Sequence, residues 1–180
     1  PSRSGAIYLA RVTRIDPGLN AAFVALGDGA DGFLRAREVA RLEEAPGKHA
    51  NIDRLLHQGE AILVQVLADG HADKGPALTT HLTLTGQFLE LRPGGSGVTL
   101  PESVKGRDAD RLSRLLAPLL AEYEGLRPRP ALVTHPEPLA AAGEELRRLR
   151  QRWREIDAKR DGAQAPACLD AGPEPAARLL

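Results

Sequence analysis

Apolar and polar residues alternate along the first half of the chain in the pattern of short, curved strands. Between Gly5 and Leu34, three runs with a period of two are separated by turn residues such as Asp16-Pro17-Gly18. Proline fixes φ and glycine accepts positive φ, so both mark strand ends. Residues 61–67 are almost continuously apolar, as in a strand buried on both faces. Residues 77–84 alternate again and are rich in β-branched side chains, so they complete five predicted strands.

A helical segment is expected between the third and fourth of these strands. Residues 35–44 carry an approximate apolar stripe, and residues 52–56 are expected to form a single helical turn. Five strands with an insertion at this point are typical of the oligonucleotide/oligosaccharide-binding (OB) barrel. The pattern therefore predicts an α+β protein, a five-stranded OB-fold barrel followed by a small mixed α/β subdomain.

The second half of the chain changes composition around Gly86. A short strand at 88–91 and a glycine-rich turn at 94–97 precede an amphipathic helix predicted at 108–120. The glycine-rich turn has no following lysine and no helix start, so it predicts a plain hairpin rather than a phosphate cradle.

The last elements are predicted from prolines and from a leucine stripe. Residues 126–133 are expected to form an edge strand, because Pro128 and Pro130 lack the N–H that a sheet ladder needs. The longest helix is predicted at 138–159, with one apolar stripe that faces a core. The stripe consists of Leu139, Ala142, Leu146, Leu149, Trp153 and Ile156.

Composition and charge narrow the possible functions. The 24 basic and 24 acidic residues cancel, so the chain as a whole has no electrostatic attraction for nucleic acid. Cys168 is the only cysteine, which excludes an internal disulfide and fits a reducing cytoplasm. No apolar run approaches the roughly 18 residues of a membrane span. The chain opens on Pro1 and contains no methionine, so we expect it to be a piece of a longer protein.

Few residues suggest chemistry. The five histidines are scattered without a paired spacing, no Ser/His/Asp arrangement is recognisable, and we predict no catalytic and no metal-ligating residue. Phe23 and Phe33, with Tyr8, either form a stacking platform for unpaired bases or are core, and the pattern alone favours core. Lys74, in an Asp-Lys-Gly turn, is either a phosphate contact or a solvated turn lysine.

Six segments of the barrel half form one colinear set: Ile7-Tyr8, Val12-Thr13-Arg14-Ile15-Asp16-Pro17, Ala21-Ala22-Phe23-Val24, Gly32-Phe33-Leu34, Val64-Gln65-Val66 and the closing Lys74-Gly75-x-x-Leu78-Thr79-Thr80. Together these segments resemble the RNA-binding domain of the bacterial ribonuclease E/G family. The resemblance implies an S-one-type OB barrel at 5–84 that holds single-stranded RNA. The family positions that match Phe23, Phe33 and Lys74 contact RNA, and we add Tyr8 and Arg11 to this predicted RNA-binding set.

Residues 85–165 resemble, more loosely, the family's subdomain that senses a 5′-monophosphate on RNA. Where the family has an Arg-Thr pair after a strand, we match Val133-Thr134-His135. A neutral threonine does not replace a guanidinium that holds phosphate bidentately. We therefore assign Thr134 and His135 to the sensing position and predict that they do not distinguish 5′-monophosphate from 5′-hydroxyl RNA.

The resemblance also implies what the parent protein does. It would be a Mg²⁺-dependent endoribonuclease, a hydrolase of RNA processing or decay that is cytoplasmic, and homo-oligomerisation of the parent is a further expectation. We expect its metal-binding carboxylates to lie outside this chain, residues 166–180 to begin a truncated ribonuclease-H-like subdomain, and this chain alone to be inactive. The alternative is a non-catalytic OB-fold module that binds protein or the ribosome, which the zero net charge favours.

Overall fold

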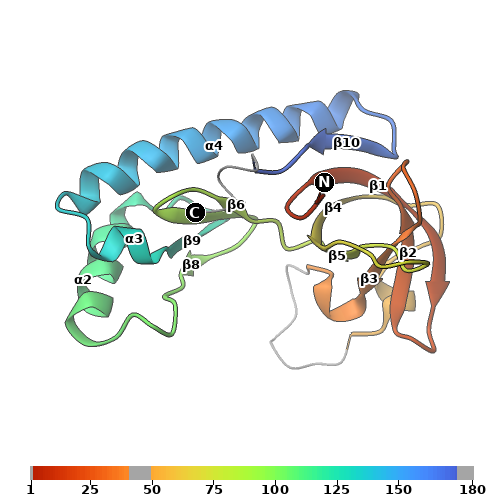
Figure 1. Ribbon diagram of the computed structural model, residues 1–180, viewed down its shortest axis with the longest axis horizontal. Coiled ribbons are helices and arrows are strands. Elements are labelled where there is room, and N and C mark those ends of the chain that lie inside the picture. The colour runs from red at the N-terminus through yellow and green to blue at the C-terminus, as the bar shows by residue number, and fades with distance from the viewer. Residues whose placement is uncertain (1, 41–49, 174–180) are drawn as a thin grey trace. The chain divides into compact units, whose positions relative to one another are not determined.

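A computed structural model describes residues 2–40 and 50–173 of the chain, which form two compact units (Figure 1). The barrel unit comprises the chain up to Leu82 together with the segment from Ala158 onward. The second unit comprises Thr83–Asp157. The divisions thus fall at 82/83 and 157/158, where the sequence suggested 84/85 and 165/166.

The predicted five-stranded barrel is confirmed. Its strands are β1 (Ile7–Asp16), β2 (Ala21–Ala25), β3 (Gly32–Arg35), β4 (Ala61–Ala68) and β5 (Ala77–Thr79). They pair in the order β1-β2-β3-β5-β4, and β4 pairs with β1 to close the barrel. The β3–β5 pair is parallel and the other pairs are antiparallel. Closure leaves no free sheet edge among these five strands apart from their ends.

A sixth strand, β10 (Ala167–Asp170), lies against the barrel from the far end of the chain. It pairs antiparallel with β1, where Tyr8 faces Cys168 and Leu9 faces Ala167 (Figure 1). Residues Ala167–Asp170 therefore extend the sheet of the barrel. The assignment of residues 166–180 to a ribonuclease-H-like subdomain stays a prediction.

The barrel core follows the period of two seen in the sequence. Side chains at alternate positions of the strands point inward and are at most 3% exposed. Full burial of one valine or leucine contributes about 1.5–3 kcal/mol, so these positions dominate the stability of the barrel. They are Tyr8, Ala10, Val12, Ala22, Val24, Leu34, Val64, Val66 and Leu78.

The prediction that residues 61–67 are buried on both faces is wrong. Only Val64, Gln65 and Val66 are buried in β4, whereas Leu67 is 50% exposed. A small barrel has a single interior, so outward side chains of β4 reach solvent unless another segment covers them. Gln65 is buried although it points outward, and its amide donates to the carbonyl oxygen of Gly5, in the segment before β1, at 3.0 Å.

The prediction of a helix at 35–44 is wrong over residues 35–40. Residues 41–44 lie outside the part of the chain that the structure describes. The chain forms only a 3₁₀ turn, Ala36–Glu38, and Val39 is extended. The carbonyl oxygen of Glu38 accepts the N–H of Thr80 at 2.9 Å instead of continuing a helix. This bond also takes Thr80 out of the β5 ladder, which is why the strand predicted at 77–84 ends at Thr79.

The remaining short helix of the barrel unit agrees with the sequence. A single helical turn, α1 (Ile52–Leu55), is present at the predicted position. Asn20 anchors it, because its side-chain oxygen accepts the N–H of Ile52 at 2.8 Å and its amide donates to Ala50 at 2.8 Å.

The second unit contains a four-stranded sheet and the longest helix. The sheet order is β6-β7-β9-β8. Its strands are β6 (Leu84–Thr85), β7 (Leu89–Pro93), β8 (Gly97–Val98) and β9 (Glu124–Pro128). The helices are α2 (Gly106–Leu116), the 3₁₀ turn Ala117–Leu119, α3 (Pro130–Val133) and α4 (Pro138–Gly162), which continues past Asp157. No helix of the described residues is long and apolar enough to cross a membrane.

The strand predicted at 126–133 is present as β9, but it ends at Pro128 and the prediction that it is an edge strand is wrong. Strand β9 lies inside the sheet between β7 and β8, and the chain then turns into α3. Pro128 is the last residue of β9, and Pro130 occupies the first turn of α3. A proline costs no hydrogen bond in the first turn of a helix, so both prolines mark the end of the strand rather than an edge.

The apolar stripe of α4 is confirmed except at Leu139, and Trp153 within it is half-buried. Ala142, Leu146, Leu149 and Ile156 are buried, whereas Leu139 is 57% exposed. Buried beside them is a carboxylate, Glu145, which is 4% exposed. It accepts three backbone N–H groups between β6 and β7, those of Gln87, Phe88 and Leu89, at 2.6–2.8 Å. These bonds fix the β6–β7 turn to the helix.

A second charged contact joins α4 to β9. Arg150 donates from Nε and Nη2 to the carboxylate of Glu124, which is 9% exposed, and Ala121 N–H also donates to it at 3.0 Å. Burial on its own raises the pKa of Glu124, but the Arg150 and Ala121 hydrogen bonds outweigh it, so the pKa lies below its ordinary value. The ionised carboxylate therefore stabilises the fold above the ordinary pKa of about 4.5.

We expect this stabilisation to disappear as pH falls through the lowered pKa of Glu124. An Arg150→Gln variant should be less stable than wild type at pH 7 and should lose less stability between pH 7 and pH 3. Urea unfolding followed by fluorescence of Trp153, the only tryptophan, reports on this unit. Arg148→Gln is the control, since Arg148 pairs with Glu144 at an exposed site and should change little. Equal pH dependence in wild type and Arg150→Gln would contradict the prediction.

Candidate nucleic-acid interface

Two phenylalanine rings meet on the outer face of the barrel. Phe23 of β2 and Phe33 of β3 are direct cross-strand partners. Their ring centroids lie 5.6 Å apart at an interplanar angle of 67°, an edge-to-face pair. The adjacent Ala22, Val24 and Leu34 point into the core, so the two rings point outward. Both rings are only partly buried, and neither belongs to the core cluster of the barrel.

An arginine lies over each ring. The guanidinium carbon of Arg14 is 4.3 Å from the centroid of Phe23, and that of Arg35 is 5.2 Å from the centroid of Phe33. Both distances are within the range of a cation–π interaction. We call Arg14, Phe23, Phe33 and Arg35 the aromatic row. It joins two aromatic surfaces to two positive charges on one face of the barrel.

Sequence reasoning missed both arginines, and for different reasons. Arg35 follows Phe33 by two residues on β3, so strand alternation alone places them on one face. Arg14 was hidden by a β-bulge at Thr13, since β1 pairs Val12 with Val24 and then Arg14 with Phe23. An irregularity of this kind shifts the facing of every later residue by one, and the printed sequence carries no sign of it.

Lys74 lies in the loop between β4 and β5, close in the fold to the aromatic row. Its side chain is exposed. Pro76, two residues further along the chain, lies beside β3, because its carbonyl oxygen accepts the N–H of Phe33 at 2.8 Å. A Cβ on Gly75 would overlap the carbonyl oxygen of Asp31, so the loop packs directly on the β2–β3 connection. Lys74 also lines an open cavity of about 500 Å³ together with Arg3.

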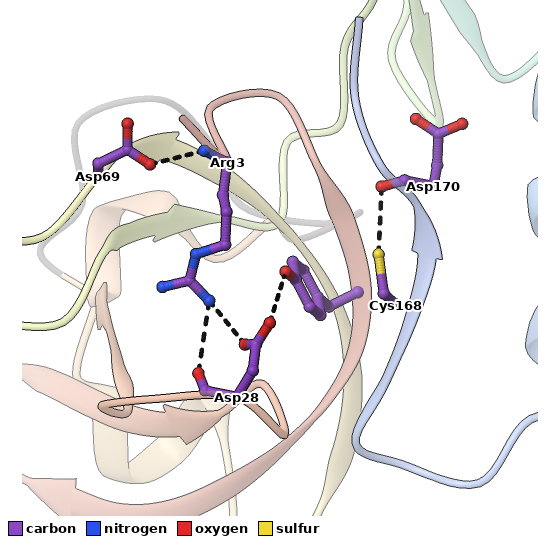
Figure 2. A network of polar contacts seen from close by, with 6 residues as sticks. Arg3, Asp28, Asp69, Cys168 and Asp170 are labelled. Carbon is purple, nitrogen blue, oxygen red and sulfur yellow. Dashed lines mark hydrogen bonds and ion pairs between the residues drawn. The ribbon is translucent and has the colours of Figure 1, made fainter. Parts of the chain in front are cut away.

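Tyr8 occupies the interior of the barrel. It is 3% exposed, and its hydroxyl donates to the Asp28 carboxylate at 3.4 Å. Arg3 joins the same network, with its guanidinium 2.6 Å from Asp28 and its backbone N–H donating to Asp69 at 2.8 Å (Figure 2). Burial, followed by the charge of Asp28, raises the pKa of Tyr8 against the opposing effect of Arg3. Tyr8 therefore ties the start of the chain to the β2–β3 connection and presents no exposed ring.

Arg11 is half-buried and bonded to backbone. Its Nη1 donates to the carbonyl oxygen of Gly59 at 2.6 Å, and its Nη2 lies 3.5 Å from that of Ala165. These bonds hold the loop before β4 and the segment before β10. Of the five predicted RNA-binding residues, the structure brings Phe23 and Phe33 together with Lys74 nearby, and it places Tyr8 and Arg11 in structural contacts.

Thr134 and His135 lie in the second unit, after α3. Thr134 is exposed, and the His135 ring packs edge-to-face on Phe88 with centroids 5.1 Å apart. His135 Nδ1 accepts the N–H of Glu137 at 2.9 Å. The residue that directly follows β9 is Arg129, whose guanidinium donates to the carbonyl oxygen of Gly86. The sequence prediction placed the end of this strand at Val133, so it did not identify Arg129 as the residue that follows the strand.

No group of three or more His, Cys, Asp or Glu side chains within residues 2–40 and 50–173 is arranged to hold a metal ion. In the barrel, the Asp28 carboxylate accepts hydrogen bonds from Arg3 and Tyr8, and the Asp31 carboxylate accepts one from the Thr13 hydroxyl. The described residues therefore do not fit the divalent cation that the resemblance implies. We assign this part of the chain no metal-dependent step.

Comparison with known proteins agrees with this geometry. Residues 2–79 match the S1 RNA binding domain. The chain is similar to ribonuclease E of Nostoc sp., 32% identical over 177 residues, which cover 98% of this chain and 26% of that protein. It is similar to ribonuclease E of Escherichia coli, 37% identical over 132 residues, which cover 69% of this chain and 12% of that protein. Ribonuclease G of Escherichia coli is 34% identical over 129 residues, which cover 67% of this chain and 26% of that protein. The chain thus spans about a quarter of the Nostoc relative.

Proposed function

Because this chain belongs to the ribonuclease E/G family, we propose that it is the part of an endoribonuclease of RNA processing or decay that binds single-stranded RNA. The observation that carries the proposal is the aromatic row. Two partly exposed rings and two guanidinium groups lie on one face of an S1 RNA-binding barrel, with the exposed Lys74 nearby.

The chemistry of the row suits unpaired bases. A base in a duplex has both faces covered by its neighbours, whereas an unpaired base can stack on an aromatic side chain. Such stacking is tolerant of sequence, because every base has a π-face. Arg14, Arg35 and Lys74 would provide positive charge for the phosphates between the stacked bases. Local charge of this kind needs no positive charge on the whole chain, whose net charge is zero.

In this proposal the described residues bind and orient the substrate, and other residues of the whole protein cleave it. The Mg²⁺ that the resemblance implies would be held by those other residues. Oligomerisation and a cytoplasmic location are parts of the same proposal. They rest on the family alone.

We expect the chain to bind a single-stranded RNA of about ten nucleotides more tightly than a duplex of the same length. Fluorescence anisotropy at several salt concentrations measures both affinities. The logarithm of the binding constant should fall with the logarithm of salt concentration by about 0.7 for each phosphate contacted. A folded chain that binds neither RNA would contradict the proposal and favour the alternative of a protein-binding or ribosome-binding module.

We also expect 5′-monophosphate RNA and 5′-hydroxyl RNA to bind equally. The strand β9 is followed by Arg129 and then by Pro130, which has no hydroxyl to complete an Arg-Thr pair. The guanidinium of Arg129 already donates to Gly86. Competition between the two RNAs for one labelled RNA gives the ratio directly. A preference for the phosphate that is lost in Arg129→Ala would show that Arg129 leaves Gly86 and senses the 5′ end, contrary to this prediction.

A further inference from the structure

The two arginines of the aromatic row occupy the surfaces on which bases are proposed to stack. Arg14 lies 4.3 Å from the centroid of Phe23 and Arg35 lies 5.2 Å from that of Phe33. A base that stacks on either of these covered faces meets a guanidinium first. Each arginine is therefore either displaced by RNA or becomes part of the RNA contact.

The backbone places these side chains in one line. Arg14, Phe23 and Phe33 are successive cross-strand partners on β1, β2 and β3. The β-bulge at Thr13 brings Arg14 into this line, because without it the partner of Phe23 would be Thr13. Thr13 points elsewhere and donates its hydroxyl to the Asp31 carboxylate at 2.6 Å. Bulges often re-aim a side chain next to a functional site.

Neither guanidinium is held strongly by an acidic residue. Arg14 Nη2 is 4.0 Å from Asp16, in a pair whose arginine is 64% exposed, so that pair is weak. Within residues 2–40 and 50–173, Arg35 makes no ion pair with an acidic side chain, and its own side chain is exposed. The donors of both groups are therefore available to a ligand.

A guanidinium has two properties that suit an RNA contact. Its plane stacks on a base as it does on a phenylalanine ring, and its N–H groups point outward in the plane toward phosphate oxygens. A lysine carries the same charge without the plane. The two residue types therefore separate stacking from charge.

We propose that Arg14 and Arg35 are RNA-binding residues that close over the bases held by Phe23 and Phe33. Each guanidinium lifts from its ring, the base enters, and the guanidinium stacks on the outer face of that base. This inference rests on the proposed RNA binding by the barrel and names two further residues for it. The occupant of each gap is one unpaired base of a single-stranded RNA.

The test replaces each planar guanidinium group by the ammonium group of lysine, which keeps the positive charge. The double variant Arg14→Lys/Arg35→Lys is compared with wild type for binding of a ten-nucleotide single-stranded RNA that carries 2-aminopurine. We expect about a fivefold or greater loss of affinity, weaker quenching of 2-aminopurine, and an unchanged salt slope, because the number of charges is the same. Arg54→Lys, on the exposed side of α1, is the matched control and should bind like wild type.

Two results would overturn the inference. Equal or tighter binding by the double lysine variant would mean that the arginines only cover the rings in the free protein. A loss of affinity without any change in quenching would mean that they do not touch the bases. In both cases the Phe23→Ala variant tests the proposed function separately. If RNA binding depends on Phe23 but not on the two guanidinium groups, the inference about the arginines is contradicted and the proposed RNA binding by the barrel stands. If the wild-type chain binds no RNA, both the inference and the proposed function are contradicted.

Discussion

Replacing Phe23 and Phe33 together with alanine is expected to weaken binding of a short single-stranded RNA by at least about 30-fold. Stacking contributes roughly 1–3 kcal/mol per base, and a loss of about 2 kcal/mol over two bases corresponds to this factor. Each single alanine variant should lose at least about fivefold. Fluorescence anisotropy against a labelled ten-nucleotide RNA measures all three variants.

Two kinds of control separate stacking from a general loss of structure. Phe23→Tyr and Phe33→Tyr keep the rings on the outer face and should bind nearly as wild type. Tyr123→Ala removes a ring that is 76% exposed in the second unit and should not change RNA affinity. The alanine variants lose an edge-to-face pair of about 0.5–1.5 kcal/mol, so their circular dichroism must show that the barrel still folds.

The opposite outcome would be clear. If the folded double alanine variant binds RNA as tightly as wild type, the rings do not carry the binding. The S1 domain would then have to hold RNA through another surface, and the open cavity lined by Arg3 and Lys74 would be the next place to examine.

The barrel could be predicted because its core repeats every second residue. Tyr8, Ala10 and Val12 are an unbroken example, and all three point inward. Over residues 35–40, the described part of the helix expected at 35–44, no α-helix forms because one long-range bond, from Thr80 N–H to the carbonyl oxygen of Glu38, competes with helix formation. A contact between residues about 40 positions apart leaves no periodic trace in the sequence. The same bond explains the early end of β5.

The candidate site did not follow from the pattern, which favoured core for Phe23 and Phe33, and only the family resemblance pointed to them as RNA contacts. In the structure both rings flank inward-pointing residues, so they lie outside the barrel core. Tyr8 stands at an inward-facing position of β1, between the core residues of the same strand. Its ring is therefore buried in the barrel. Arg14 required the bulge at Thr13, and bulges are set by tertiary packing rather than by local pattern.

Replacing Gly75 with alanine is expected to lower the free energy of unfolding by about 1–3 kcal/mol and the melting temperature by roughly 5–15 °C. A Cβ at this position would overlap the carbonyl oxygen of Asp31 and lie 2.7 Å from its carbonyl carbon. Both atoms belong to the backbone, so no change of rotamer relieves the overlap. The loop that carries Lys74 must move away from the β2–β3 connection, and Lys74 moves with it.

RNA affinity should therefore fall in Gly75→Ala even at temperatures where the variant is fully folded. Lys74→Ala is the companion variant, which should lose affinity without losing stability, because the side chain is exposed. Gly18→Ala is the matched glycine control, since the nearest atom to its added Cβ is a side-chain oxygen of Asp16 at 3.4 Å. Thermal unfolding followed by circular dichroism and anisotropy at low temperature give the two quantities. A Gly75→Ala chain with wild-type melting and wild-type RNA affinity would show that the loop has room to shift and that the position of Lys74 does not depend on Gly75.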